Sequence, residues 1–413
     1  MRVLVTSARA PHALAIIRSF GDKGWEVTAG DCTRLSPGLY SRFVNRRLVY
    51  PSVTEKPAEF IRTLLAELHL RHYDLLFPAF EDLFLIARVR DKLPPNLPHL
   101  VPPYDQLMLV HNKASLARFC EQHGISSPHT IQPKNEAELE QAASETAYPV
   151  IIKLAETNNS TGLTIAKDVE TLRSRYLKLV KFYSLTGEQW PLLQAKIDGE
   201  MIYSLFMADQ GRVVGQLVYR PLMMFPDGGG TAFYREAIRH APVEEVSRKC
   251  IAALGWHGFI GLDYIVDRGT GTAYLIDVNP RPSPAYNLGL AAGVDFTQQF
   301  IDLAQKKSPR PNLEPREGVR SKILFVEILW FLFQLLPGKG YFQRARKAFT
   351  VFRKRNFIPD IHRRDDKKPS LVMALFVYYF MFIINTIKPS RGGYMFGCNY
   401  DRALADRMLK EAE

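Results

Sequence analysis

The sequence has 413 residues, which is too long for one compact core and predicts two to four domains. Its composition, 46% hydrophobic and 23% charged residues, is typical of a folded protein. The net charge of +12 is concentrated in residues 338–368, which hold eleven Lys or Arg and three Asp, and this excludes a chain-wide nucleic-acid-binding surface.

The cysteines and the N-terminus predict a cytoplasmic protein. Cys32, Cys120, Cys250 and Cys398 lie far apart and form no CxxC pair, which fits a reducing compartment. The first seventeen residues lack the long apolar core and cleavage site of a signal peptide, and they predict a strand followed by a helix.

The chain divides into four parts by its patterns. Residues 1–105 alternate short apolar runs with helical stretches, which predicts an open parallel βαβ domain. Residues 106–189 predict a linker helix and a small α+β subdomain, and residues 190–305, where strands dominate, predict a larger catalytic subdomain. Residues 306–413, called the C-terminal tail here, follow with basic and apolar helical sequence. The expected fold class is α/β.

A phosphate-binding element is predicted at residues 150–162. The apolar run "VIIK" ends in Lys153, and a polar loop rich in Asn, Ser, Thr and Gly follows it. Backbone N–H groups of such a loop and a lysine charge suit phosphate oxygens. A lysine at a strand end is more often only solvated, and neither GxxxxGK[ST] nor GxGxxG occurs at the expected places.

A metal site is predicted where two strands form a hairpin. The strands "LDYIV" and "AYLIDV" are separated by the turn sequence "DRGTGT". The hairpin brings Asp263 near Asp277 and Asn279, and three oxygen ligands of this kind suit Mg²⁺. The alternative is a pair of solvent-facing acids, but both acids interrupt apolar runs, where an unpaired charge is costly.

The ordered motifs resemble those of the ATP-grasp superfamily. The resemblance covers residues 1–305 and rests on "HNKASLARFCEQHGI", "YPVIIKLAETNNSTG", "LLQAKIDGEMIYSLFMAD", "GFIGLDYIV" and "YLIDVNPRPSPA". It implies an ATP-grasp architecture, in which a small lid subdomain and a larger subdomain hold ATP and Mg²⁺ (or Mn²⁺). The order and spacing of the motifs are much more specific than any one of them.

The resemblance also implies a role for each matching residue. Lys113 and Lys153 are expected to contact the phosphates of ATP, and Glu200 is expected to bind the ribose. The hinge against which the adenine lies would consist of Gln194, Lys196 and Ile197. The metal ligands are Asp263, Asp277 and Asn279, and Arg281 steadies the transferred phosphate or the acyl phosphate. The family often has Glu at the position of Gln194 and commonly at the two Asp positions.

Further residues are predicted for the acceptor side of the site. Residues 157–162 and 219–236 are candidate covers that exclude water, and the second contains Gly228-Gly229-Gly230. A GGG run is usually a plain turn, but beside the resemblance we expect Arg220 to contact substrate or triphosphate. Three strand-end residues complete the predicted acceptor pocket: Ser7, Glu81 and Asp82.

The C-terminal tail joins two apolar stretches, 325–337 and 371–387, through the basic segment. Three interpretations remain open: helices lying on an anionic membrane, a membrane-spanning pair, and packing on the body or dimerisation. Basic residues beside apolar aromatic helices favour the first. We therefore expect a cytoplasmic protein that is peripheral to the inner face of the cell membrane.

The predicted function is an ATP-dependent carboxylate–amine ligase. It would phosphorylate a small-molecule or lipid-linked carboxylate, pass the acyl group to an amine, and release ADP and phosphate. No nucleic acid is expected as a partner, and a homodimer is possible. The alternatives are a bicarbonate-using carboxylase of the same superfamily and a nucleotide-binding scaffold without turnover.

Overall fold

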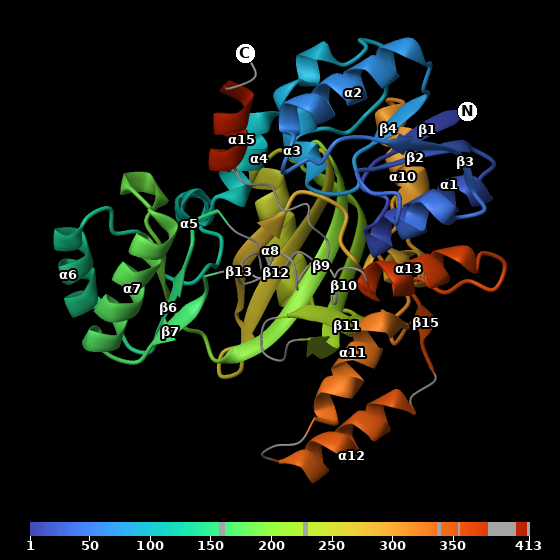
Figure 1. Cartoon of the computed structure of the whole chain (residues 1–413). Helices are drawn as coiled ribbons and strands as arrows, with labels where there is room; N and C mark the ends of the chain where they lie inside the picture. The colour runs from blue at the N-terminus through green and yellow to red at the C-terminus, as the bar shows by residue number, and fades with distance from the viewer. Residues whose placement is uncertain (157–161, 226–229, 337–339, 354–355, 379–401, 411–413) are drawn as a thin grey trace.

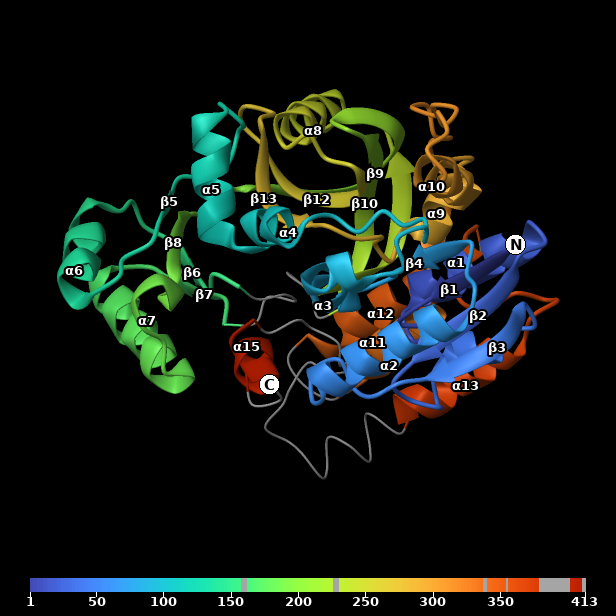
Figure 2. The ribbon, with the colours of Figure 1, turned by 90° about the horizontal axis from the view of Figure 1, so that it is seen from above.

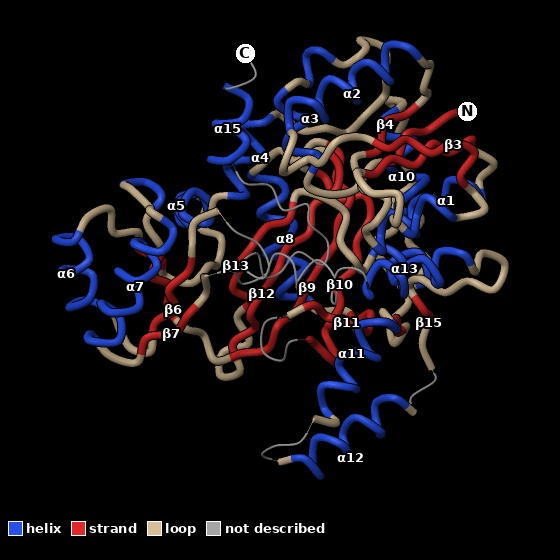
Figure 3. The backbone as a smooth tube through the Cα atoms, viewed as in Figure 1, coloured by secondary structure: helices blue, strands red, loops and turns tan. Residues whose placement is uncertain are grey.

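The structure, a computed structural model, contains three β-sheets with helices packed around them (Figure 1). It describes all residues except 157–161, 226–229, 337–339, 354–355, 379–401 and 411–413. The N-terminal sheet and the small sheet lie at opposite ends of the molecule (Figure 2), and the largest sheet lies between them (Figure 3).

The N-terminal sheet is parallel, with the strand order β3-β2-β1-β4. Its strands β1 (Arg2–Val5) and β4 (Leu75–Phe77) are apolar and buried on both faces, because helices cover the sheet. The other strands are β2 (Glu26–Asp31) and β3 (Val44–Val49), and the helices are α1 (Pro11–Asp22), α2 (Pro57–Leu70) and α3 (Asp82–Arg88).

The small sheet is antiparallel, with the order β5-β8-β6-β7. Its strands are β5 (Thr130–Ile131), β6 (Val150–Lys153), β7 (Thr164–Ala166) and β8 (Leu192–Ala195). Helices α6 (Glu136–Glu145) and α7 (Val169–Tyr183) begin at Asn135 and Asp168, whose side chains cap the first turns. Both helices pack on this sheet around the buried Tyr176.

The central sheet has seven strands in the order β13-β12-β9-β10-β11-β14-β15. Its long strands are β9 (Gly199–Asp209), β10 (Arg212–Phe225), β11 (Thr231–Ile238), β12 (Gly258–Asp267) and β13 (Ala273–Asn279), all paired antiparallel. The two short strands, β14 (Arg320–Lys322) and β15 (Ile358–Pro359), come from the C-terminal tail.

Five further helices pack on the sheets or between them. These are α4 (Tyr104–His111), α5 (Lys113–Gln122), α8 (Ala241–Ala253), α9 (Tyr286–Ala291) and α10 (Phe296–Ala304). One apolar core runs from the N-terminal sheet to the central sheet, and in it the rings of Phe77 and Phe300 lie 4.1 Å apart between centroids. The N-terminal and central sheets are therefore docked through a shared core.

The C-terminal tail packs on the body over much of its described length. Its helices are α11 (Leu324–Gln334), α12 (Tyr341–Phe352), α13 (Lys368–Tyr378) and α15 (Arg402–Lys410). Asp360 forms an ion pair with Arg235 of β11, and Asp366 accepts a hydrogen bond of 2.9 Å from Arg18 of α1. The tail thus ties the central sheet to the N-terminal domain.

The arrangement of sheets and helices confirms the predicted α/β class. Within the part of the chain that the structure describes, no helix has the length and apolarity needed to cross a bilayer. The predicted apolar stretch 371–387 is described only as far as Tyr378, and there Met373 and Phe376 are buried against the body. Its remaining residues, 379–387, lie outside the described residues.

Candidate active site

Two neighbouring strands bring the predicted metal ligands together. Asp263 on β12 lies directly opposite Asp277 on β13, so both side chains emerge on one face of the central sheet. The pairing is irregular after Asp263, and bulges of this kind often re-aim side chains beside active sites. Asn279 lies two residues beyond Asp277, and its Nδ2 donates a hydrogen bond of 3.4 Å to Asp263 Oδ2.

The two carboxylates disturb each other electrostatically. Burial, and after it the charge of Asp277, raises the pKa of Asp263 to about 8. Two acids held side by side cannot both ionise cheaply unless a cation lies between them. This pair and the Asn279 amide therefore fit a hard divalent ion that takes its other ligands from water or phosphate. No group of three or more His, Cys, Asp or Glu side chains suited to a metal occurs among the described residues.

Two lysines from different elements approach the acidic pair. Lys113 begins α5, and its Nζ lies 3.5 Å from Asp277 Oδ1. Lys153 ends β6, is only 8% exposed, and its Nζ lies 3.5 Å from the carbonyl oxygen of Ile276 on β13. Burial, and to a smaller extent Lys113, lowers the pKa of Lys153 to about 8. An anion bound here would favour the charged form of Lys153.

The residues predicted to bind adenine and ribose lie along the stretch of chain that leads from β8 of the small sheet to β9 of the central sheet. Gln194 is buried in β8, and its Nε2 donates to Thr130 Oγ1 at 2.9 Å. Lys196 and Ile197 come directly after β8, and Glu200 is the exposed second residue of β9. Gln194 pairs with Ile151 of β6, two residues before Lys153, and Glu200 pairs with Val266 of β12, three residues beyond Asp263.

Arg281 joins the acidic site to the N-terminal sheet. Its Nη2 lies 3.3 Å from Oε1 of Glu81, and the plane of its guanidinium lies over the ring of Phe80, 4.3 Å from the ring centroid. Arg281 is 11% exposed and Glu81 only 1%, so this ion pair is shielded from water. Of the three predicted strand-end residues, Glu81 thus reaches the site. Ser7 and Asp82 are buried and hydrogen-bonded to each other at 2.9 Å.

Arg220 lies away from the acids, in contrast to its predicted role. Its neighbour Tyr219 is paired with Tyr203, which is paired with Asp263, so these three share one face of the sheet. Side chains alternate along a strand, and Arg220 therefore points to the other face. There it is half exposed and donates two hydrogen bonds to Glu236, at 2.8 and 2.6 Å.

Two tyrosines that the sequence analysis did not single out lie on the same face of the central sheet as Asp263. The rings of Tyr203 and Tyr219 stack with their centroids 5.5 Å apart. Burial, and after it the charge of Asp263, raises the pKa of Tyr219 to about 12. The alternation that places Asp263 on this face also places both tyrosines, but only once the order of β12, β9 and β10 is known.

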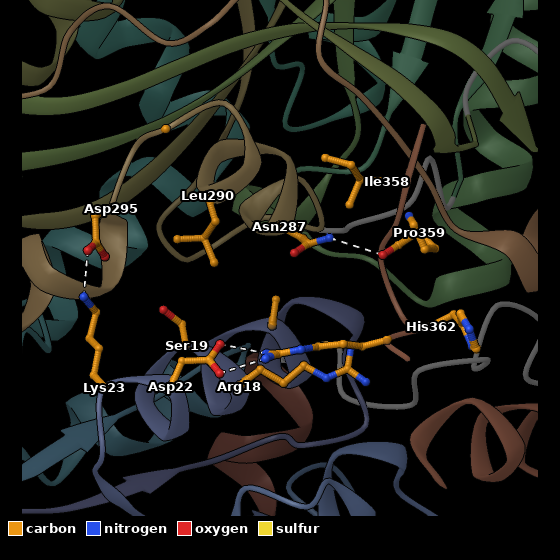
Figure 4. A pocket seen from close by; sticks show the side chains of 13 residues that line it. Arg18, Ser19, Asp22, Lys23, Asn287, Leu290, Asp295, Ile358, Pro359 and His362 are labelled. Atoms are coloured by element: carbon orange, nitrogen blue, oxygen red, sulfur yellow. Dashed lines mark hydrogen bonds and ion pairs between the residues drawn. The ribbon is translucent and has the colours of Figure 1, made fainter. Parts of the chain in front are cut away.

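A cavity of about 580 Å³ lies elsewhere, between α1, the α9–α10 region and the tail residues 358–363 (Figure 4). Charged side chains that line this cavity form ion pairs with each other: Lys23 with Asp295 at 2.7 Å, and Arg363 with Asp22 at 2.7 Å. A second cavity, of about 530 Å³, lies between α5 and β5. Neither cavity is lined by the acids or lysines of the candidate site.

Comparison with known proteins agrees with this geometry. A family model of the ATP-grasp domain matches residues 110–284, which contain Lys113, Lys153, Asp263 and Asp277. Residues 110–284 are thus an ATP-grasp domain, which confirms the ATP-grasp architecture expected from the sequence.

Individual relatives are enzymes of this superfamily. The D-alanine–D-alanine ligase of Ectopseudomonas mendocina (strain ymp) is 25% identical over 196 residues, which is 43% of this chain and 59% of that ligase. The L-amino acid ligase of Bacillus licheniformis superposes with a TM-score of 0.58 at 17% identity, covering 74% of each chain.

A carboxylase is also similar in structure. It is the biotin carboxylase domain of the Hydrogenobacter thermophilus 2-oxoglutarate carboxylase, solved with MgADP, ADP and bicarbonate. Its TM-score is 0.61 at 17% identity, over 77% of this chain and 73% of that one. At this identity the two structural similarities show the fold alone.

Proposed function

We propose that this protein is an ATP-dependent carboxylate–amine ligase that works through an acyl phosphate. The observation that carries the proposal is the meeting of four elements at one place. Lys113 from α5, Lys153 from β6 and Asp263 with Asp277 from the β12–β13 pair converge beside Arg281. Cations around an acid pair suit phosphoryl transfer, which depends on positioning and on neutralising charge.

Each residue has a role in the proposal. ATP is held at its phosphates by Lys113 and Lys153, at adenine by Gln194, Lys196 and Ile197, and at ribose by Glu200. Asp263, Asp277 and Asn279 would hold Mg²⁺ or Mn²⁺, and the bound ion would offset the charge of the phosphate oxygens. Arg281, fixed by Glu81, holds the transferred phosphate. Because Arg220 lies on the opposite face, it has no role here.

The chemistry proceeds in two steps. A carboxylate oxygen of the substrate attacks the γ-phosphorus of ATP, and ADP leaves, which gives an acyl phosphate. The amine nitrogen then attacks the acyl carbon, phosphate leaves, and the nitrogen loses a proton. The Arg281 guanidinium is a planar fork that suits the oxygens of the phosphate in both steps. Residues 157–161 and 226–229, within the two predicted covers, lie outside the described residues.

A carboxylase that activates bicarbonate is the second candidate, because the similar biotin carboxylase domain contains bicarbonate with MgADP. ADP release tests both candidates. A panel of carboxylates, including lipid-linked ones, is incubated with ATP and Mg²⁺, with and without amines, and bicarbonate is tested separately. A ligase releases ADP only with its carboxylate, whereas a carboxylase requires bicarbonate. A scaffold releases none, and that result would overturn the proposal.

The control variant is Asp277→Asn. It removes a proposed metal ligand while it keeps the size of the side chain and leaves both lysines in place. We expect it to bind nucleotide measurably and to release no ADP. Turnover in this variant equal to that of the parent protein would contradict the assignment of the metal site.

A further inference from the structure

Helices α11 and α12 form a hairpin that projects from the body of the molecule (Figure 1). Its base is anchored: Trp330 of α11 is fully buried and lies against Phe233 of β11, with the ring centroids 5.6 Å apart. The two helices contact each other through Phe331, whose ring is 5.1 Å from that of Phe349 and 5.0 Å from that of Phe352. The α11–α12 hairpin is therefore a fixed element and not a loose extension.

The outer surface of the α11–α12 hairpin is unusually apolar. Phe342 is 85% exposed, and seven more large apolar side chains within 25 residues of the chain are between 37% and 54% exposed. They are Ile328, Leu332, Phe333, Leu336, Tyr341, Phe349 and Phe352. Single exposed apolar residues are ordinary, but a gathering of this size marks a contact surface.

The charge of the same hairpin has one sign. Its cations are Arg344, Arg346 and Lys347, and Arg353 follows directly after α12. Its one acid among the described residues of the two helices, Glu327, is buried and paired with Lys322 at 2.5 Å. The exposed surface thus combines aromatic and aliphatic side chains with uncompensated positive charge.

We propose that the α11–α12 hairpin docks on an anionic lipid bilayer and lies in its headgroup layer. Basic side chains beside apolar aromatic ones are what an amphipathic element needs to bind such a surface. Neither helix is long enough to span a membrane. A second copy of the chain is a poorer occupant, because a twofold contact through this surface would set two surfaces of the same positive charge against each other.

Docking through this hairpin would also orient the catalytic sheet. Strand β14 pairs with β11, and α11 begins two residues after β14 ends. The connection is too short to let the hairpin turn independently. A bilayer that holds the α11–α12 hairpin therefore holds the central sheet at a fixed angle, whichever substrate the enzyme takes.

The test is flotation of the full chain with vesicles of phosphatidylcholine alone and with 30% phosphatidylglycerol. The charge variant is Arg346→Glu/Lys347→Glu, and the apolar variant is Leu332→Ser/Phe342→Ser, at the two most exposed apolar side chains of the hairpin. The matched controls are Lys178→Glu/Lys181→Glu and Phe182→Ser on α7, where Phe182 is 75% exposed. Because the substituted side chains are exposed, melting temperature and ADP release should stay unchanged.

We expect the parent chain to float with anionic vesicles and to float less at high salt, which screens charge. The charge variant should bind at least about 25-fold more weakly, since each lost cation costs about fivefold and the anionic surface also repels the two added carboxylates. The apolar variant should bind about tenfold more weakly or worse, and the α7 controls should bind normally. Unchanged flotation of both hairpin variants, or no flotation of the parent chain, overturns the proposal. A parent dimer that Leu332→Ser/Phe342→Ser dissociates would instead identify a second copy as the occupant.

Discussion

Binding of MgADP should change the protonation of the candidate site in a direction that depends on pH. The pKa of Asp263 is raised to about 8, so its carboxyl is mostly protonated at pH 7. Bound Mg²⁺ requires the carboxylate, and binding at pH 7 should therefore release most of a proton from this group. The cost of that ionisation is roughly 1 kcal/mol at pH 7 and disappears above pH 8.

Lys153 should act in the opposite sense. Its pKa is lowered to about 8, so that at pH 9 it is about nine-tenths neutral. A bound phosphate favours the ammonium form, and binding at pH 9 then takes up about 0.9 proton. The net exchange should change from a release of protons at pH 7 to an uptake of protons at pH 9.

Calorimetry in pairs of buffers with different ionisation enthalpies measures this exchange. Asp263→Asn should abolish the release at pH 7, and Lys153→Met should abolish the uptake at pH 9. Proton exchange that stays near zero at both pH values in the parent protein would refute the account of the acid pair and of the buried lysine.

Three substitutions test the contacts around Arg281 and the tail. Arg281→Lys keeps the charge but loses the planar fork, so kcat should fall far more than KM for ATP rises; equal kcat would refute its role. Glu81→Gln removes the charge that holds Arg281, so kcat should fall while the melting temperature changes little, and Glu81→Asp should restore part of the activity. A loss of kcat in Glu236→Gln, which frees Arg220 on the other face, would show that this readout is not specific to the site. Asp360→Ala leaves Arg235 buried without its partner and should lower the free energy of unfolding by about 3–5 kcal/mol in urea titrations. A loss below 1 kcal/mol would show that this ion pair does not anchor the tail.

Local patterns were enough to predict the acid pair. Two strands joined by a short turn pair with each other, and alternation then places Asp263 and Asp277 on one face. Local patterns could not predict on which face of the sheet Arg220 lies. Its face depends on which residue of β10 lies opposite Tyr203 of β9, and a shift of one residue reverses the face. Nothing local distinguishes Arg220 from its neighbour in this respect.

The contact between Glu81 and Arg281 could not be predicted from a pattern, because 200 residues separate the two. Hydrophobic runs in the tail were equally ambiguous. Met373 and Phe376 of α13 are buried against the body, whereas Phe342 of α12 is exposed, although both stretches are rich in apolar residues. Hydrophobicity alone does not say which surface an apolar helix covers; only the tertiary arrangement decides it.

The buried ion pairs between the C-terminal tail and two parts of the body determine which part of the molecule can move on its own. Asp360 forms an ion pair with the central sheet and Asp366 forms one with the N-terminal domain, so these two parts should move as one rigid body. The ion pair described between the tail and the small subdomain, Arg402 with Glu156 at 3.4 Å, is partly exposed, and the chain leaves the small sheet through the short stretch after β8. Closure over a nucleotide should therefore be a rotation of the small sheet, together with α6 and α7, about residues 196–198. Spin labels on α7 and α10 should approach each other when MgADP binds, while labels on α2 and α10 keep their distance.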